Sequence, residues 1–271
     1  MALCESGRCE SAFNIAGYAR DAMRRLGEEW GVDLASLSVQ PNTMNDASPD
    51  LIWQDDATGG KLPVSRRFDD PYFSATDGRA ECEFVFLAGN GLPERWADAE
   101  TFTIGELGFG TGLNLLQTWR WWRDVRQPGQ QLVFQSVEAF PLDAADALTA
   151  LARWPDLTKD AEALWDGGFD TPRALDNQTT LHVHHAMAAD AVPQFASCDA
   201  WFLDGFSPAK NEAMWSPELM KSVFERTVQG GTFASYTAAG WVRRNLENAG
   251  FSVERCPGFG RKRHMIVGSK P

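Results

Sequence analysis

In the later part of this 271-residue chain, hydrophobic and polar positions alternate between a strand-like period and a helical period. After residue 100, short runs rich in β-branched and aromatic residues predict strands, and stretches with apolar residues at helical spacing separate most of them. The predicted strands read TFTIGEL, QLVFQSVE, TTLHVHH, DAWFLDG, GTFASYT and FSVERC. The predicted helices span 113–125, 143–153, 216–228 and 238–249. This alternation favours an α/β fold with a mainly parallel sheet.

The two ends of the chain follow other patterns. FSVERC and RHMIVG, joined by PGFGRK, predict an antiparallel strand pair at one edge of the sheet. Two extended runs around Thr58-Gly59-Gly60 predict a hairpin, and residues 83–90 form another extended piece or lead into a helix. Residues 1–50 predict a helical appendage and a polar linker, poorly ordered. We therefore divide the chain into 1–50, an extended N-terminal subdomain at 51–100, and a core at 101–271.

Composition excludes several classes of protein. The chain is 44% hydrophobic and 23% charged, as is usual for a folded globular protein. No apolar run approaches the roughly 18–20 residues that cross a bilayer, and the start MALCESGRCE lacks the features of a signal peptide. We expect a cytoplasmic protein without a membrane partner. The five cysteines include no CxxC pair, so neither a disulfide framework nor a thiolate zinc site is expected.

Charge is distributed unevenly along the chain. The net charge is -12, which disfavours nucleic acid binding on average, because Lys and Arg supply most of the affinity for phosphates. From residue 205 onward, however, ten Lys and Arg residues stand against five acidic ones. This quarter of the chain either forms a patch that faces a polyanion or carries ordinary solvated surface charges.

A glycine-rich loop follows the first strand of the core, in Glu106-Leu-Gly108-Phe-Gly110-Thr-Gly112. Glycines allow a tight turn and a close approach of the backbone to a ligand, and the following helix offers free N–H groups. A dinucleotide-binding loop would have a small residue where this chain has Leu113. The pattern instead resembles the first motif of class I S-adenosylmethionine-dependent methyltransferases, although a purely structural turn is the alternative. The candidate cofactor-binding residues here are Glu106, Gly108, Phe109, Gly110, Thr111, Gly112 and Asn114.

Two acidic residues follow later strands of the core. Glu138 ends the second strand, where a carboxylate can accept hydrogen bonds from the ribose hydroxyls of adenosylmethionine or of NAD. Asp204 follows the fourth strand, within DAWFLDGFSPAKNEAMW. A carboxylate there could hydrogen-bond an acceptor amine and help remove its proton. Lys210 is a candidate phosphate contact, and Asn211 is a further candidate substrate contact.

The sequence resembles one family over most of its length, from about residue 51 to 268. The segments that carry this resemblance are FDDPYFS, VFLAGN, GELGFGTGLNLL, VEAFPL, DAWFLDGFSPAKNEAMW, GGTFASYTAAGWVRRNLENAGF and PGFGRKRHM. They resemble the methyltransferase domain of the bifunctional MnmC proteins and their stand-alone MnmD relatives. The resemblance implies a class I, Rossmann-like methyltransferase sheet. It also implies that S-adenosylmethionine methylates the 5-aminomethyl group of the tRNA wobble uridine, giving 5-methylaminomethyl-(2-thio)uridine.

The resemblance also implies roles for further residues and for a partner. Asp204 becomes the catalytic candidate that stabilises the amine as it loses a proton. In the fused relatives a flavin-dependent oxidase domain follows; none is expected here, so a separate oxidase acting upstream is a candidate partner. The wobble base can be stacked on an aromatic residue, for which Phe206, Tyr236 and Phe259 are candidates. The predicted contacts to the anticodon stem-loop are Arg243, Arg244, Arg261, Lys262 and Arg263.

One position departs from the family pattern. The third strand of the family ends in Gly-Asp, whose Asp contacts the adenine amino group, whereas this chain has Ala186-Met187. Adenine recognition near Met187 therefore depends on backbone groups, on a shifted Asp190 or on another contact. His182 and His184 share one face of this strand without an acidic or Cys mate, so no metal site is expected. A small-molecule methyltransferase and a non-catalytic nucleotide-binding protein remain alternative functions.

Overall fold

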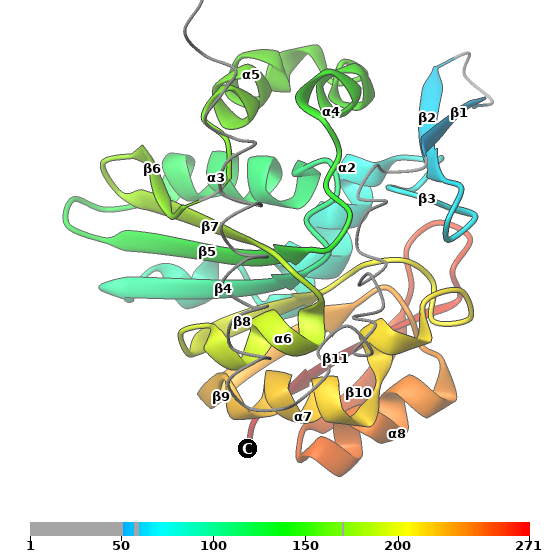
Figure 1. Ribbon diagram of the computed structural model, residues 1–271. Coiled ribbons are helices and arrows are strands. Elements are labelled where there is room, and N and C mark those ends of the chain that lie inside the picture. Colours follow the sequence, from blue (N-terminus) through cyan, green and yellow to red (C-terminus); the bar gives the residue numbers. More distant parts are fainter. Residues whose placement is uncertain (1–50, 57–59, 170) are drawn as a thin grey trace, which may run out of the picture. The chain divides into compact units, whose positions relative to one another are not determined.

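An eight-stranded sheet forms the centre of the fold in the computed structural model (Figure 1). The structure describes residues 51–56, 60–169 and 171–271, which fall within one compact unit, Ala47–Pro271. The appendage and linker predicted for residues 1–50 lie outside the described residues. The order of the strands across the sheet is β10-β11-β9-β8-β4-β5-β7-β6. Their bounds are β4 Thr101–Leu107, β5 Gln131–Glu138, β6 Arg173–Asp176, β7 Thr179–His185, β8 Cys198–Leu203, β9 Thr227–Ser235, β10 Ser252–Pro257 and β11 His264–Ser269.

The sheet is mainly parallel, as predicted. Strand β4 pairs in parallel with β5 on one side and with β8 on the other, and β7 and β9 continue the parallel order outward. Strands β10 and β11 form the predicted antiparallel pair at one edge, and β6 adds an antiparallel strand at the other edge. The chain leaves β4 toward β5 and returns later to β8. This reversal of strand order places a ligand crevice at the carboxyl ends of β4 and β8.

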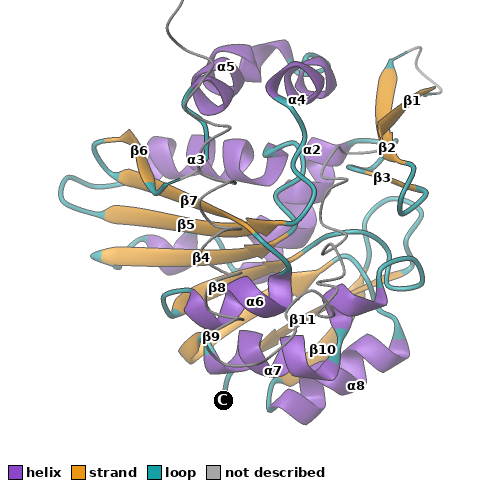
Figure 2. Cartoon of the chain, in the orientation of Figure 1, coloured by secondary structure: helices purple, strands orange, loops and turns teal. Residues whose placement is uncertain are grey.

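Helices cover both faces of the sheet (Figures 1 and 2). One face carries α2 (Gly78–Glu81), α3 (Leu113–Val125), α4 (Ala144–Leu151) and α5 (Thr158–Asp166). The other face carries α6 (Ala188–Ala191), α7 (Pro217–Glu225) and α8 (Gly240–Ala249). Local sequence explains where these helices begin: the Ser216 hydroxyl accepts the Leu219 N–H, and Pro217 occupies the first turn of α7.

The segment before the core forms a small sheet and a helical connection. Strands β1 (Leu51–Asp55), β2 (Lys61–Ser65) and β3 (Asp70–Pro71) are antiparallel, which confirms the predicted hairpin, although residues 57–59 lie outside the described part. The 83–90 segment is helical: a π-helix spans Cys82–Leu87 and a 3-10 turn spans Ala88–Asn90. Leu87 is buried in the same hydrophobic core as residues of β4 and β5. Helical spacing places the apolar residues of this segment on one face, which packs against that core. A second 3-10 turn, Glu94–Trp96, leads into the sheet.

Candidate active site

The glycine loop has the backbone geometry that its sequence predicts. Gly108, Gly110 and Gly112 have φ angles of +85°, +52° and +77°, in the region that favours glycine. A Cβ atom on Gly108 would lie 3.1 Å from the Cα atom of Gly205, which follows β8. The loops after β4 and β8 therefore touch through glycine backbones. This close packing forms the floor of the crevice at the point where the strand order reverses.

Glu138 is fixed beside this loop at the carboxyl end of β5. One carboxylate oxygen accepts the Gly110 N–H at 3.0 Å, and the other accepts the Phe140 N–H at 2.9 Å. Burial raises the pKa of Glu138, and these backbone N–H groups oppose that rise. Each oxygen keeps a further lone pair with which it can accept a hydroxyl hydrogen. The carboxylate is thus held in one orientation as a hydrogen-bond acceptor at the wall of a cavity.

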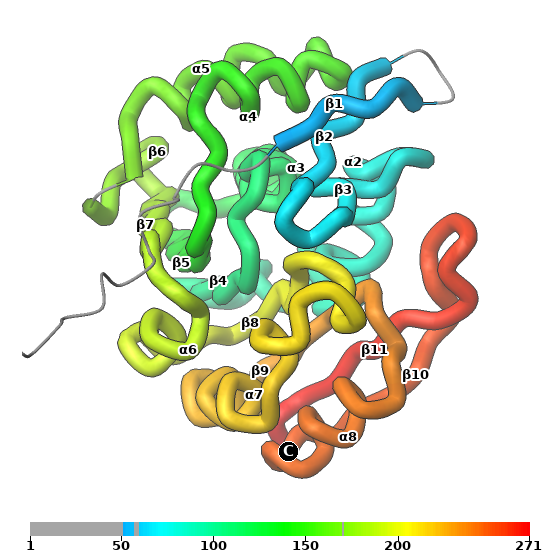
Figure 3. The backbone as a smooth tube through the Cα atoms, turned by 45° about the vertical axis from the view of Figure 1, so that its right-hand side comes forward, coloured from blue at the N-terminus to red at the C-terminus, as the bar shows by residue number. Residues whose placement is uncertain are grey.

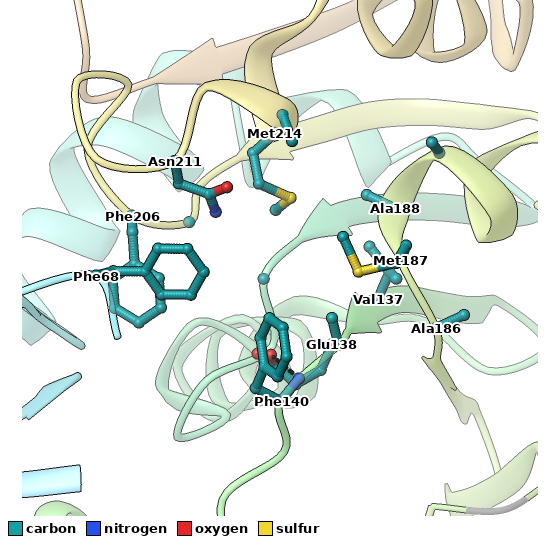
Figure 4. A pocket seen from close by; sticks show the side chains of 15 residues that line it. Phe68, Val137, Glu138, Phe140, Ala186, Met187, Ala188, Phe206, Asn211 and Met214 are labelled. Carbon is teal, nitrogen blue, oxygen red and sulfur yellow. Dashed lines mark hydrogen bonds between the residues drawn. The ribbon is translucent and has the colours of Figure 1, made fainter. Parts of the chain in front are cut away.

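A cavity of about 90 Å³ lies beyond the carboxyl ends of the central strands. Figure 4 shows Phe68 and Phe206 on one side, Met187 on the other, and Glu138 between them. The Phe68 and Phe206 rings stack with their centroids 4.7 Å apart. The remaining lining residues are Gly108, Val137, Ala139, Phe140, Ala186, Ala188, Ala189, Gly205, Asn211, Ala213 and Met214. A mostly apolar slot with one fixed carboxylate suits a nucleoside, with its base against the apolar walls.

Met187 stands at the cavity wall with 45% of its surface exposed. Its thioether is a weak hydrogen-bond acceptor, so it offers adenine an apolar contact. Asp190 is exposed on α6, and its side chain is not among the cavity-lining residues. Among the described residues, the cavity wall around Met187 is therefore apolar, and the acidic residue of the lining is Glu138.

Glu106 lies behind the glycine loop, only 1% exposed, and does not line the cavity. Its carboxylate accepts the Ser136 hydroxyl at 2.6 Å and the Asn114 side-chain amide at 3.0 Å. The same Asn114 amide donates to Asp204 at 2.8 Å. Burial raises the pKa of Glu106 well above its usual value. Glu106 and Asn114 thus form a support that orients Asp204 from beneath the loop.

Asp204 lies half-buried directly after β8, next to the cavity-lining Gly205. The pKa of Asp204 is raised to about 7, chiefly by burial. The hydrogen bond from Asn114 and the positive charge of Lys262 oppose this rise, whereas the negative charge of Glu81 adds to it. A carboxyl group with this pKa can both accept and release a proton near neutral pH.

Among the aromatic candidates, Phe206 lines the cavity, whereas Tyr236 and Phe259 do not. The Tyr236 hydroxyl donates to the Gly205 carbonyl at 2.9 Å, which ties the loop after β9 to the loop after β8. The Phe259 ring lies 5.9 Å from that of the exposed Phe84.

Lys210 and Lys262 are both engaged within the chain. Lys210 hydrogen-bonds the Asp69 carbonyl and pairs with the Asp69 and Asp70 carboxylates at 3.2 and 3.6 Å. Asp70 also accepts the Ser207 N–H, so the 204–211 loop is anchored to the end of the N-terminal hairpin. Lys262 pairs with Glu81 at 2.8 Å. Their predicted contacts with RNA phosphates stay predictions.

The four arginines predicted to contact tRNA lie at the carboxyl edge of the sheet. Strands β9 and β10 run in the same direction, since each pairs antiparallel with β11. Arg243 and Arg244 follow β9, and Arg261 and Arg263 follow β10, so all of them leave the sheet at the edge that holds the cavity. Arg243 pairs with Glu247 at 3.7 Å. Within the described ranges, the exposed Arg244, Arg261 and Arg263 form no ion pair.

The histidines, the cysteines and the helices bear on three further features, namely metal sites, disulfides and membrane spans. The His182 and His184 rings lie 3.7 Å apart on β7, and no cluster in the described part of the chain could hold a metal ion. Cys82, Cys198 and Cys256 are free thiols. In that same part of the chain, no helix has the length and apolar character to cross a membrane.

Sequence reasoning missed several residues around the cavity. Phe68 lies in FDDPYFS and Phe140 in VEAFPL, so segments already singled out by their sequence carried that signal. Met214 follows the 204–211 loop. Glu81, the last residue of α2, had no local signal, since its partner Lys262 lies 181 positions away.

Comparison with known proteins shows what this chain is similar to. Residues 142–271 match a family described as S-adenosyl-L-methionine-dependent methyltransferases. The chain is 43% identical over 236 residues to the tRNA 5-methylaminomethyl-2-thiouridine biosynthesis bifunctional protein MnmC of Caulobacter vibrioides, covering 82% of this chain and 38% of that protein. The chain is therefore similar to this methyltransferase family over residues 142–271, and to one part of the MnmC proteins.

Further similarities agree with this assignment. The chain is 45% identical over 217 residues to MnmC of Pseudomonas aeruginosa, covering 76% of this chain and 33% of the relative. It spans less than two fifths of the length of these curated relatives. The solved structure of MnmC2 from Aquifex aeolicus superposes with a TM-score of 0.67 over 93% of this chain and 83% of that one, at 22% identity. That structure supports the fold.

Proposed function

We propose that this methyltransferase transfers a methyl group from S-adenosyl-L-methionine to the amine of 5-aminomethyl-(2-thio)uridine at the tRNA wobble position. The product is 5-methylaminomethyl-(2-thio)uridine. The observation that carries this proposal is the identity of 43–45% to proteins named for 5-methylaminomethyl-2-thiouridine biosynthesis. The reaction belongs in the cytoplasm, and its substrate comes from a preceding step, for which a separate flavin-dependent oxidase is the proposed partner.

The residues around the cavity fit the cofactor. Glu138 keeps acceptor lone pairs for the ribose hydroxyls after binding two backbone N–H groups. Gly110 leaves open the space that a side chain would fill, since a Cβ atom there would lie 3.3 Å from the Tyr72 ring. Phe140 and Met187 offer apolar contacts to the adenine. These features support binding of adenosylmethionine by the loop and strand ends that the sequence singles out.

Asp204 is our candidate for preparing the acceptor. The bound cofactor supplies an electrophilic methyl group on a sulfonium, with which only a neutral amine reacts. Asp204, with a pKa of about 7, accepts the proton of the incoming ammonium and later releases it to water. Asn114 holds the carboxylate in place through its 2.8 Å hydrogen bond. Positioning of the two reactants by these side chains accounts for much of the expected rate enhancement.

The exposed arginines and the aromatic wall suit an RNA loop. Arg244, Arg261 and Arg263 place positive charge at the cavity edge of a protein whose net charge is -12. Such a distribution orients an anticodon stem toward one face, because the acidic remainder repels phosphate. Phe206 lies in the cavity wall, where a splayed base can stack on it.

A transfer assay tests the proposal. The purified chain is incubated with adenosylmethionine carrying a labelled methyl group. The acceptor is tRNA whose wobble uridine has been modified as far as 5-aminomethyl-2-thiouridine. Mass spectrometry of the digested nucleosides should show 5-methylaminomethyl-2-thiouridine, and tRNA without the aminomethyl group should stay unlabelled. Transfer to small amines without transfer to tRNA would support a small-molecule methyltransferase. Absence of adenosylmethionine binding in calorimetry would support a non-catalytic protein.

A further inference from the structure

A buried carboxylate lies beside Asp204 without a role in the chemistry described so far. Glu81 ends α2 and is 9% exposed. Its carboxylate accepts a hydrogen bond from the Lys262 ammonium at 2.8 Å. Lys262 comes from the loop between β10 and β11, which Figures 1 and 3 show reaching toward the segment that contains α2. A buried carboxylate needs such a cation, because an unpaired charge there is costly.

An aromatic ring completes the surroundings of this ammonium group. The Lys262 nitrogen lies 3.9 Å from the centre of the Tyr236 ring, a cation–π distance. Tyr236 is held by its hydrogen bond to the Gly205 carbonyl and by edge contact with Trp215. The ammonium therefore lies between a carboxylate and a fixed aromatic face. This arrangement is typical of sites that recognise alkylammonium groups.

The cage formed by Glu81 and Tyr236 borders the candidate acceptor site. Gly205, which Tyr236 holds, follows Asp204 directly and lines the cofactor cavity. The charges of Glu81 and Lys262 both act on Asp204, since Glu81 raises its pKa and Lys262 lowers it. A cation in the cage is therefore close to the carboxyl group that we propose as the proton acceptor.

The two charged members of the cage differ in how easily they can move. The Glu81 side chain is 12% exposed and lies on a helix, whereas the Lys262 side chain is 42% exposed and lies on a turn. Lys262 can turn into solvent when another cation takes its place beside Glu81, because a hydrated ammonium on a flexible stem is stable there. Glu81 cannot move into solvent in the same way, because its side chain is buried at the end of α2. The cage is thus a fixed anionic site with a replaceable cation.

We propose that Glu81 and the face of Tyr236 bind the cationic aminomethyl group of the substrate, and that Lys262 occupies this subsite until the substrate displaces it. The inference rests on the proposed function, since it assigns the primary alkylammonium group of that substrate. The Lys262 side chain is itself a primary ammonium on a methylene group, so a cage that holds it fits the same group on the base. Displaced Lys262 is then free to contact RNA phosphate beside Arg261 and Arg263.

Binding of two matched RNAs tests this assignment. One anticodon stem-loop carries the aminomethyl group at the wobble uridine, and the other carries a neutral hydroxymethyl group. The ratio of their dissociation constants, measured near pH 7 by fluorescence anisotropy, cancels the phosphate contacts that both RNAs share. Wild-type protein should prefer the amine. Glu81→Gln should reduce that preference by about tenfold or more, toward equal binding. Lys262→Met should increase it, because the internal competitor is gone.

Controls separate this inference from its alternatives. Lys221→Met removes another Lys–Glu pair, Lys221–Glu225 on the exposed surface of α7, and should leave the ratio unchanged. Equal losses of affinity for both RNAs in Glu81→Gln and Lys262→Met would overturn the inference and make the pair a loop anchor. If Glu81→Gln does not fold, the double variant with Lys262→Met removes both charges and should bind the two RNAs equally. Retained preference there would also overturn it.

The binding experiment, together with the methyl-transfer assay above, distinguishes failure of the inference from failure of the proposed function. Wild-type protein that methylates tRNA but shows the same preference after Glu81→Gln overturns the cage alone. Wild-type protein that methylates no tRNA overturns both.

Discussion

At the scale of single residues, the proposed chemistry depends on the surroundings of one carboxyl group. Asp204 has an ordinary pKa of 3.8 that burial raises to about 7. Below that pH the folded protein holds the proton, and above it the carboxylate is free to accept one from the substrate. Asn114 donates hydrogen bonds to both Glu106 and Asp204, so one amide joins the acid of the glycine motif to the proposed proton acceptor.

Asp204→Asn should lower the methyl-transfer rate by roughly 10² to 10⁴ while leaving adenosylmethionine affinity unchanged, because it removes the proton acceptor only. In wild-type protein the single-turnover rate should rise with pH up to about 7, as Asp204 ionises, and the variant should lack this rise. Asp190→Asn, on the exposed surface of α6, serves as the control. An unchanged rate in Asp204→Asn would assign this residue a structural role.

Met187→Asp tests adenine recognition at the cavity wall. An acidic side chain there can accept the adenine amino hydrogens, which the thioether does poorly. A hydrogen bond to a charged acceptor contributes roughly 1.5 kcal/mol or more, so calorimetry should show adenosylmethionine bound about tenfold more tightly. Equal or weaker binding would mean that a backbone group already fills this role.

At the scale of elements, the site depends on loops that follow parallel strands and are tied to one another. The loop after β4 touches the loop after β8 through Gly108 and Gly205. The loop after β8 is anchored in turn to the N-terminal hairpin through Asp70 and to the loop after β9 through Tyr236. Each tie joins segments distant in sequence, so the cavity wall depends on four elements at once.

Gly110→Val should abolish detectable adenosylmethionine binding in calorimetry, because a branched side chain at a φ of +52° fills the space beside Tyr72. Gly129→Val is a matched control: Gly129 has a φ of +92°, a Cβ atom there meets nothing within 4 Å, and it precedes the amino end of β5. Both variants should lose roughly 1–2 kcal/mol of stability. Equal cofactor affinity in the two would remove the loop from the cofactor site.

At the scale of the whole molecule, charge is segregated. The chain carries a net charge of -12, yet the loops after β9 and β10 bring arginines to the edge that holds the cavity. Three of them, Arg244, Arg261 and Arg263, form no ion pair within the described ranges and can meet phosphates directly. The protein thus offers RNA one cationic face beside the proposed acceptor site.

Contacts from these three arginines predict a log-log slope of tRNA affinity against salt of roughly -2 to -3. Arg261→Glu with Arg263→Glu should raise the Michaelis constant for tRNA steeply and flatten this slope, with adenosylmethionine affinity unchanged. Lys221→Glu, a charge reversal on α7, should change neither. A Michaelis constant that is independent of salt would instead favour a small-molecule acceptor.

The sequence by itself determined the framework and which candidate residues lie at the strand ends. The strand and helix periods predicted the parallel sheet with its antiparallel pair, and the positions of Gly110, Glu138 and Asp204 followed because each lies at the end of a predicted strand or in the loop after it. Residues 83–90 were left between strand and helix, since a short apolar run fits either period. Burial against the core decided for the helix.

The tertiary structure alone decided which charged side chains meet. Lys210 and Lys262 looked alike in sequence as free cations for phosphate. Folding pairs Lys210 with Asp69, 141 positions away, and Lys262 with Glu81, 181 positions away. Ion pairs over such separations have no period and no local motif, because they depend on where the chain returns and not on its neighbours.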